Sequence, residues 1–204
     1  MSTDEHWDSV YKNKSPDGVS WYRPRLEHSL ALIDGCSLPR DACIVDIGGG
    51  ASTLVDDLLE QGFSRVAVAD LSPRALEHSR ARLGERASAV NWVVGDATTP
   101  LFDDSSVDFW HDRAVFHFLT SASARDAYVA NAARSIRPAG YALVATFSPT
   151  GPERCSGLPV VRYTSAQIAD ALGEHFTLIE EVSEEHVTPS GASQSFSYAL
   201  CRRK

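Results

Sequence analysis

Three consecutive glycines follow an apolar segment that contains an acidic residue, and this turn constrains the fold more than any other feature. Residues 43–53 read CIVDIGGGAST, which is typical of a buried strand carrying Asp46 that turns into a helix from Ser52. Glycine permits a positive φ angle and lets a ligand approach the bare backbone, and a helix start offers unpaired N–H groups. The turn therefore indicates either a cofactor site or a tight structural turn without a ligand.

Two further apolar segments also lead into acidic residues. Residues 65–70 end in Asp70, 22 positions after Gly48, and residues 90–94 are followed by Gly95 and Asp96. A carboxylate at the end of the second strand can accept hydrogen bonds from both ribose hydroxyls of a nucleoside. Because ligands of open α/β sheets bind outside the carboxyl ends of the strands, we expect the carboxylates to converge on one crevice.

These motifs, in this order, resemble those of the class I S-adenosylmethionine-dependent methyltransferases. The first motif is VDIGGG at 45–50, the ribose acid is Asp70, the adenine motif is GDA at 95–97, and IRPAG at 136–140 precedes a later strand. Two positions depart from the family pattern, because Ser52 and Ala139 stand where glycines are usual. Ser52 still permits close packing, and the turn at Ala139 is distant from the chemistry.

The resemblance implies S-adenosylmethionine as the methyl donor and S-adenosylhomocysteine as the product. Asp46 and the glycines are expected around the methionine half of the donor, Asp70 at its ribose, and Asp96 at the adenine amino group. The expected donor-binding set is Asp46, Gly48, Gly49, Gly50, Asp70, Leu71, Asp96, Ala97, His111 and Arg113.

A nicotinamide dehydrogenase is the competing cofactor interpretation. Its glycine pattern needs a third glycine at position 53, where this chain has Thr53. The chain also ends in two strand-like segments, 176–182 and 195–201, joined by residues 188–192 (TPSGA), which predicts a terminal hairpin. The methyltransferase sheet carries such a hairpin and a dinucleotide fold lacks it.

The alternation of strands and helices predicts a doubly wound α/β fold in one domain, residues 1–204. An amino-terminal segment, 1–40, precedes a cofactor-binding core, 41–204, that includes an acceptor loop at about 148–163. Helices are expected at 25–33, 52–61, 73–83, 122–136 and 165–172, and strands at 43–47, 65–70, 90–94, 107–111, 141–147, 176–182 and 195–201. The resembled fold orders seven strands 3-2-1-4-5-7-6, the last antiparallel, with helices on both faces.

Composition narrows the range of partners. The chain has 204 residues, 43% of them hydrophobic, and a net charge of −8, so nucleic acid and anionic membranes are not expected as partners. No apolar segment is long enough to span a membrane, and a cytoplasmic location is expected. The four cysteines lack the spacing of a zinc site, so no metal is expected, and the oligomeric state is not predicted.

Aromatic residues are concentrated in the amino-terminal segment. Trp7 and Tyr11 are four residues apart, which predicts a helix packed on the sheet edge through one face. Trp21 and Tyr22 lie just before the domain, and we expect them to form a lid over the methionine end of the donor and to contact the acceptor.

The end of the fourth strand should face the reaction site. His111 and Asp112 are the candidate catalytic residues, because an imidazole titrates near neutral pH and could accept the acceptor's proton. A base is optional, since methyl transfer needs mainly proximity and in-line alignment. Asp112 could instead bind the donor's ammonium group.

The acceptor is expected to be a small molecule with an O, N or S nucleophile, contacted by Trp21, Tyr22, Cys155 and Tyr163. Cys155 is either a structural loop cysteine or a contact for a soft acceptor. Two alternatives stay open. The Trp-Asp-x-x-Tyr start at residues 7–11 is similar to that of protein-lysine methyltransferases, although HDR at 111–113 replaces their Lys-Gly motif, and a non-catalytic donor-binding protein would keep the same fold.

Overall fold

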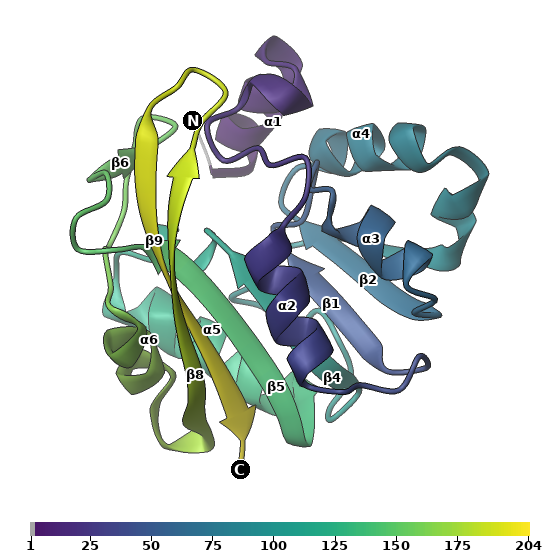
Figure 1. Cartoon of the computed structure of the whole chain (residues 1–204), viewed down its shortest axis with the longest axis vertical. Helices are drawn as coiled ribbons and strands as arrows, with labels where there is room; N and C mark the ends of the chain where they lie inside the picture. Colours follow the sequence, from purple (N-terminus) through teal and green to yellow (C-terminus); the bar gives the residue numbers. More distant parts are fainter. Residues whose placement is uncertain (1–2) are drawn as a thin grey trace.

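A mixed seven-stranded sheet forms the centre of the molecule (Figure 1). The computed structural model describes residues 3–204, with side chains from Glu5 onward. The sheet order is β3-β2-β1-β4-β5-β9-β8, in which β9 is antiparallel to β5 and β8, so the predicted order and the reversed last strand are confirmed. The strands are β1 (Cys43–Ile47), β2 (Arg65–Asp70), β3 (Val90–Val94), β4 (Val107–Arg113), β5 (Ile136–Phe147), β8 (Phe176–Val187) and β9 (Ser193–Arg203).

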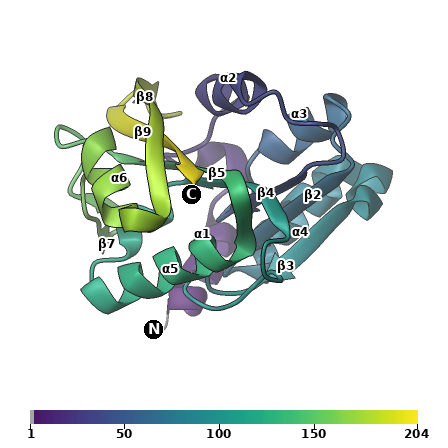
Figure 2. The same cartoon turned by 90° about the horizontal axis from the view of Figure 1, so that it is seen from below.

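Helices cover both faces of this sheet (Figure 2). Helices α2 (Glu27–Gly35), α3 (Leu54–Glu60) and α4 (Pro73–Leu83) bury leucines against one face, whereas α5 (Ala122–Ser135) and α6 (Ser165–Leu172) pack on the other. The expected helix starts at Pro73 and Ser165 are confirmed. Thr164 and Gln167 form a capping box, which satisfies free N–H groups of the first turn.

The amino-terminal segment forms α1 (Thr3–Asn13), as the spacing of Trp7 and Tyr11 predicts. Trp7 makes edge contacts with Trp21 and Phe118, with ring centroids 5.7 and 5.1 Å apart. Asp8 accepts a hydrogen bond from Ser72, the residue that caps α4. Figure 1 shows α1 beside the end of the sheet at which β1 and β2 finish.

The acceptor loop contains a small hairpin that its glycine and proline content did not predict. Strands β6 (Arg154–Cys155) and β7 (Leu158–Pro159) pair antiparallel across a turn in which Ser156 and Gly157 have positive φ angles. This turn allows the two strands to reverse within two residues. It also carries Cys155 inward, so the hairpin places the thiol in a wall of the site.

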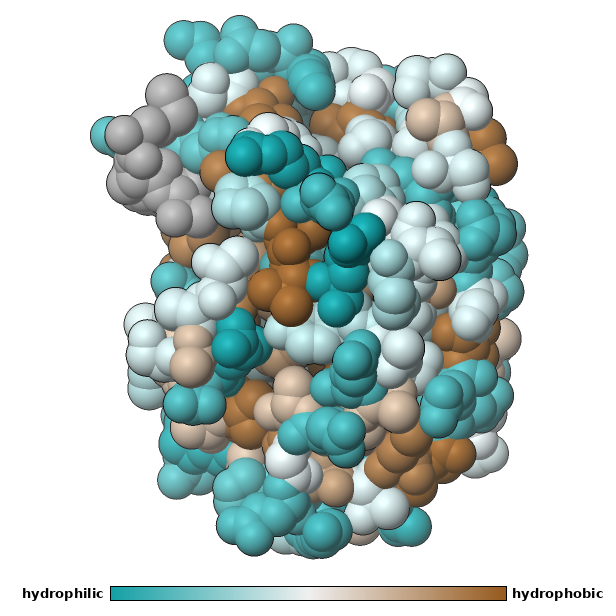
Figure 3. All heavy atoms as spheres, turned by 90° about the vertical axis from the view of Figure 1, so that its left-hand side faces the viewer, coloured by the Kyte–Doolittle hydropathy of each residue, from teal (hydrophilic) through white to brown (hydrophobic). Residues whose placement is uncertain are grey.

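On the side of the molecule that carries β6 and α6, hydrophobic residues lie in small groups separated by hydrophilic ones (Figure 3). Exposed large hydrophobic side chains among the described residues are Val94, Ile179 and Val187. Within residues 3–204, no helix is both long and apolar enough to cross a bilayer.

Candidate functional site

The glycine turn after β1 is shaped by two neighbouring carboxylates. Gly48 has a φ angle of +66°, and its N–H donates to Ala69 O on β2. A Cβ on Gly49 would collide with the carboxylate of Asp46, and one on Gly50 would lie 2.5 Å from Asp70 Oδ2. Only residues without a side chain therefore fit between these two acids.

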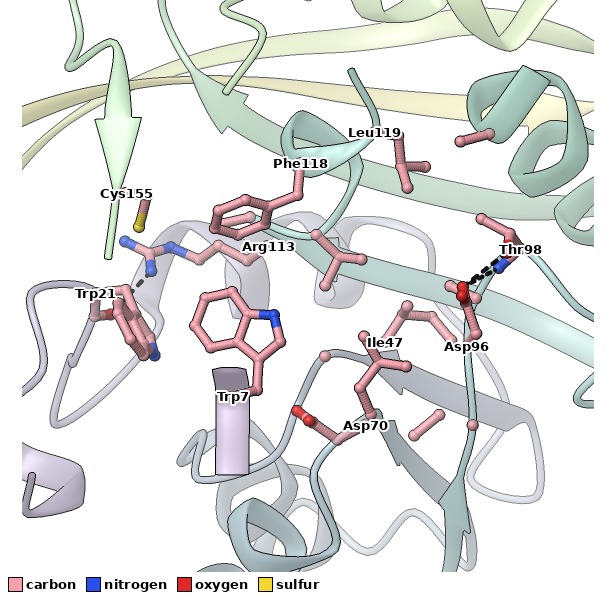
Figure 4. Close-up of a pocket in the computed structure, with 18 of the residues that line it drawn as sticks. Trp7, Trp21, Ile47, Asp70, Asp96, Thr98, Arg113, Phe118, Leu119 and Cys155 are labelled. Carbon is pink, nitrogen blue, oxygen red and sulfur yellow. Dashed lines mark hydrogen bonds between the residues drawn. The ribbon is translucent and has the colours of Figure 1, made fainter. Parts of the chain in front are cut away.

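A cavity of about 340 Å³ opens at the carboxyl ends of β1, β2, β3 and β4. Figure 4 shows Asp96 and Thr98 at one end, Trp21, Arg113 and Cys155 at the other, and Asp70 between the two ends. We name the two ends the carboxylate end and the aromatic end. Of the predicted site residues, the cavity is lined by Gly48, Asp70, Leu71, Asp96, Ala97, Arg113, Trp21 and Cys155.

Asp70 is held rigidly between the two ends of the cavity. Its Oδ1 accepts the Ser72 N–H at 2.8 Å, and Ser72 in turn caps α4 by accepting from Ala75 N–H at 3.2 Å. Burial raises the pKa of Asp70 to about 7, and the nearby charges of Asp46 and Asp8 add to this increase. A buried carboxylate of this kind is suited to accept hydrogen bonds from hydroxyl groups.

Asp46 and His111 lie side by side on β1 and β4 and border a second, smaller hollow of about 40 Å³. His111 Nδ1 is 2.7 Å from Asp46 Oδ1, and Nε2 is 2.9 Å from Ser29 Oγ on α2. Both ring nitrogens are therefore engaged, and the ring does not line the main cavity. This placement gives no support to the expectation that His111 takes a proton from the acceptor.

Asp112 points to the opposite face of the sheet, although it was expected at the reaction site. Its carboxylate accepts hydrogen bonds from Val115 N–H, Phe116 N–H and Tyr128 O–H at 2.7–3.0 Å. Burial raises the pKa of Asp112 to about 6, and these hydrogen bonds oppose the increase. The structure thus corrects the expected catalytic role, because Asp112 is fully buried and fixes the chain after β4.

Arg113 joins four chain segments at the aromatic end. Its guanidinium donates to Tyr198 Oη at 2.9 Å and to the Trp21 carbonyl at 3.1 Å, and pairs with Glu184 at 3.4 Å. The same guanidinium lies over the ring of Phe196, 4.4 Å from its centroid. Because these contacts fix Trp21 from the domain side, Arg113 holds the amino-terminal segment in place.

Trp21 and Cys155 were expected at the aromatic end, but the other residues that form its walls were not predicted from the sequence. These additional residues are Trp7, Tyr11, Phe118, Phe147 and Phe196. The signal in the sequence for Trp7, Tyr11 and Phe118 was the density of aromatics at residues 7–22 and 116–118, whereas Phe147 and Phe196 had no such signal. Burial raises the pKa of the Cys155 thiol to about 12, so the group is protonated at neutral pH.

Several predicted residues lie away from the main cavity. Tyr22 and Gly49 border the small hollow. Gly50 packs directly against the Asp70 carboxylate, and this close contact between the two residues shapes the turn. Tyr163 packs in the core against Phe116, with ring centroids 5.5 Å apart, so the structure corrects the expectation that it contacts the acceptor.

The described residues fit S-adenosylmethionine on two observations of this chain. Asp46 Oδ2 is buried and accepts no hydrogen bond from the described residues, which suits a cationic ammonium group. The glycine turn leaves bare backbone between Asp46 and Asp70, where a side chain would collide. Within residues 3–204, no group of three or more His, Cys, Asp or Glu side chains is arranged to hold a metal ion.

Comparisons with known proteins agree with this geometry. A family model described as a methyltransferase domain matches residues 45–144. EEF1A lysine methyltransferase 2 of Mus musculus is 25% identical over 100% of this chain and 84% of its own length, and the Homo sapiens protein is 23% identical over 100% and 86%. The solved structure described as "Conversion of a Disulfide Bond into a Thioacetal Group during Echinomycin Biosynthesis" aligns over 100% of this chain and 93% of its own, with a TM-score of 0.80 and 21% identity, and shows the shared fold.

The fold, the glycine motif and these similarities define an enzyme that transfers methyl groups. The chain belongs to the class I S-adenosylmethionine-dependent methyltransferases.

Proposed function

We propose that the protein methylates the ε-amino group of a lysine side chain in a protein acceptor. The observation that carries this proposal is the similarity to the two EEF1A lysine methyltransferases, which extends over the whole chain. The net charge of −8 also suits a basic protein partner.

The proposed donor site is the carboxylate end and Asp70 together with the small hollow. Asp70 would accept the ribose hydroxyls, Leu71 and Ala97 would flank adenine, and Asp96 would accept from its amino group. Asp46, Gly48 and Gly49 would surround the methionine half. S-Adenosylmethionine supplies an activated methyl group on a sulfonium, and S-adenosylhomocysteine is the product.

The aromatic end suits a lysine side chain. Trp7, Trp21 and Phe118 offer apolar ring surface along which four methylene groups can pack. Arg113 at this end is paired with Glu184, and the neutral amine is the form of lysine that attacks a methyl group.

A labelling experiment tests the acceptor class. The protein is incubated with methyl-labelled S-adenosylmethionine and purified EEF1A, the protein named in the relatives, or with a cell lysate, and protein is then separated from small molecules. Mass spectrometry that finds methyllysine in the protein fraction is the expected result. Asp70→Ala, which removes the proposed ribose acid, is the matched control and should abolish labelling.

Enclosure of the aromatic end supports a second candidate, the small-molecule acceptor. Tyr11, Cys155 and Phe196 are buried, and α1 covers this end of the cavity. Label confined to small molecules would replace the lysine proposal with this one. Binding of S-adenosylhomocysteine without transfer to either fraction would favour the non-catalytic alternative.

A further inference from the structure

A hydrogen-bonded chain of three buried side chains runs from α2 to the donor site. Ser29, His111 and Asp46 are 0%, 1% and 2% exposed, and two contacts of 2.9 and 2.7 Å join them. Their elements are distant in sequence, but the sheet order places β4 beside β1, and His111 is the register partner of Asp46. The three groups therefore form a fixed unit.

The carboxylate sets the direction of the first hydrogen bond. An ionised Asp46 can only accept, so the Nδ1–H of His111 donates to Oδ1. The Ser29 hydroxyl, which can donate or accept, makes the second hydrogen bond with Nε2. The two contacts together fix the orientation of the imidazole.

The second oxygen of Asp46 ends the chain and has no protein donor. Asp46 Oδ2 is buried, and none of the described residues donates to it. It packs against Gly49, and Asp46 borders the hollow that also contacts Gly48 and Arg113. Burying an unpaired carboxylate oxygen is costly, and a cation bound there would offset the cost.

The same three residue types form the nucleophile set of serine hydrolases, but this arrangement cannot act in that way. Ser29 is fully buried and lines neither the main cavity nor the small hollow, so no substrate carbonyl reaches its hydroxyl. The unit can only orient Asp46.

We propose that His111 is a positioning residue for the methyl donor. Its Nδ1–H holds Asp46 Oδ1, and the rotation of the carboxylate is thereby fixed so that Oδ2 faces the α-ammonium group of S-adenosylmethionine. Ser29 keeps the ring in place from α2. The proposal rests on the donor site proposed above and is independent of the acceptor.

Two substitutions of His111 separate its two contacts. The side-chain amide of His111→Asn lies near the Nδ1 position and can donate to Asp46, whereas that of His111→Gln reaches the Nε2 position and serves Ser29. Calorimetry with S-adenosylhomocysteine should give a Kd raised about tenfold or more for His111→Gln, the cost of losing a charge-assisted hydrogen bond, and about threefold or less for His111→Asn.

A second ligand distinguishes positioning from general damage. 5′-Methylthioadenosine lacks the amino-acid portion of the donor, so its Kd should stay within about twofold of wild type in both variants. Equal losses for both ligands, or equal Kd values for the Asn and Gln variants with S-adenosylhomocysteine, would overturn the proposal. Wild-type protein that binds neither ligand would instead overturn the donor site itself.

Steady-state kinetics gives an independent measurement. In His111→Gln the KM for S-adenosylmethionine should rise by about the same factor as the Kd, while kcat stays within about threefold, because the ring does not touch the acceptor. A fall in kcat at unchanged KM would show that His111 acts in the transfer step and would contradict the positioning role.

Discussion

The Cβ position of Gly50 lies 2.5 Å from Asp70 Oδ2 and 2.7 Å from Ala75 Cβ. Gly50→Ala must therefore displace Asp70 or the start of α4, and we expect the Kd for S-adenosylhomocysteine to rise at least about tenfold. Calorimetry measures this change. Gly35→Ala is the matched control, because no atom lies within 4 Å of its added Cβ, and equal behaviour of the two variants would contradict the assignment.

Donor binding should weaken below neutral pH. Burial raises the pKa of Asp70 to about 7, and only the ionised form accepts from both ribose hydroxyls. The Kd for S-adenosylhomocysteine should therefore be lowest above pH 7 and rise about tenfold near pH 6 and about a hundredfold near pH 5. Calorimetry across this range checks the slope. Asp70→Asn cannot ionise, so a slope of the same size in this variant would refute the explanation.

The pKa of Asp70 also affects the stability of the ligand-free protein, with the opposite sign. Because the folded-state value lies above the unfolded value of 3.8, the folded state binds the proton more tightly. The contribution of Asp70 to the free energy of unfolding should therefore fall as pH rises from about 4 to about 7. Denaturant unfolding should show a larger loss in the wild type than in Asp70→Asn, since Asp112, whose pKa burial raises to about 6, contributes a similar loss to both proteins.

Asp112 should be a stability residue. Asp112→Ala leaves the buried Val115 N–H, Phe116 N–H and Tyr128 O–H without their acceptor, and we expect a loss of about 3 kcal/mol or more in the free energy of unfolding. Tyr128→Phe removes one of these donors and should cost about 1 kcal/mol. Urea denaturation measures both. A fully stable Asp112→Ala protein with no transfer activity would restore the catalytic assignment.

Donor binding should change tryptophan fluorescence. Trp7 and Trp21 line the cavity and contact each other, whereas Trp92 and Trp110 lie outside it. Saturation with S-adenosylhomocysteine should quench the emission, and the change should shrink in Trp21→Phe. Fluorescence titration of both proteins checks this. An equal change in Trp21→Phe would show that the signal arises elsewhere and would remove the evidence for a lid.

Cys155 should be unreactive in the native protein. Burial raises the pKa of its thiol to about 12, and the side chain is 4% exposed. Iodoacetamide at pH 8 should therefore alkylate Cys155 only after denaturation, as peptide mass spectrometry can show. Cys155→Ser should leave kcat within about threefold of wild type. Rapid native labelling, or loss of turnover in Cys155→Ser, would support the soft-acceptor hypothesis instead.

The sheet was predictable because local signals agreed along the chain. Apolar segments ending in Asp70 or Gly95 and helices capped at Ser72 and Thr164 define nearly all of the central elements. The loop around Cys155 was less predictable, because a two-residue hairpin depends on the backbone conformation of Ser156 and Gly157 rather than on a repeated pattern.

The fourth strand shows why site residues were harder to assign. Side chains alternate along a strand, so Asp112 must face away from His111 and Arg113. That alternation was available in the sequence. The partner of His111 was not, because Ser29 reaches the ring through the packing of α2, and no local pattern links residues 82 positions apart.

The two ends of the cavity have separate origins in the chain. The carboxylate end is formed within residues 45–144, which the methyltransferase family model matches, whereas Trp7, Trp21, Phe147, Cys155 and Phe196 lie outside that stretch. Exchange of the flanking segments between relatives would therefore replace most of the aromatic end and leave the carboxylate end unchanged. New acceptor preferences could thus arise by recombination at the borders of the motif region, without new donor chemistry.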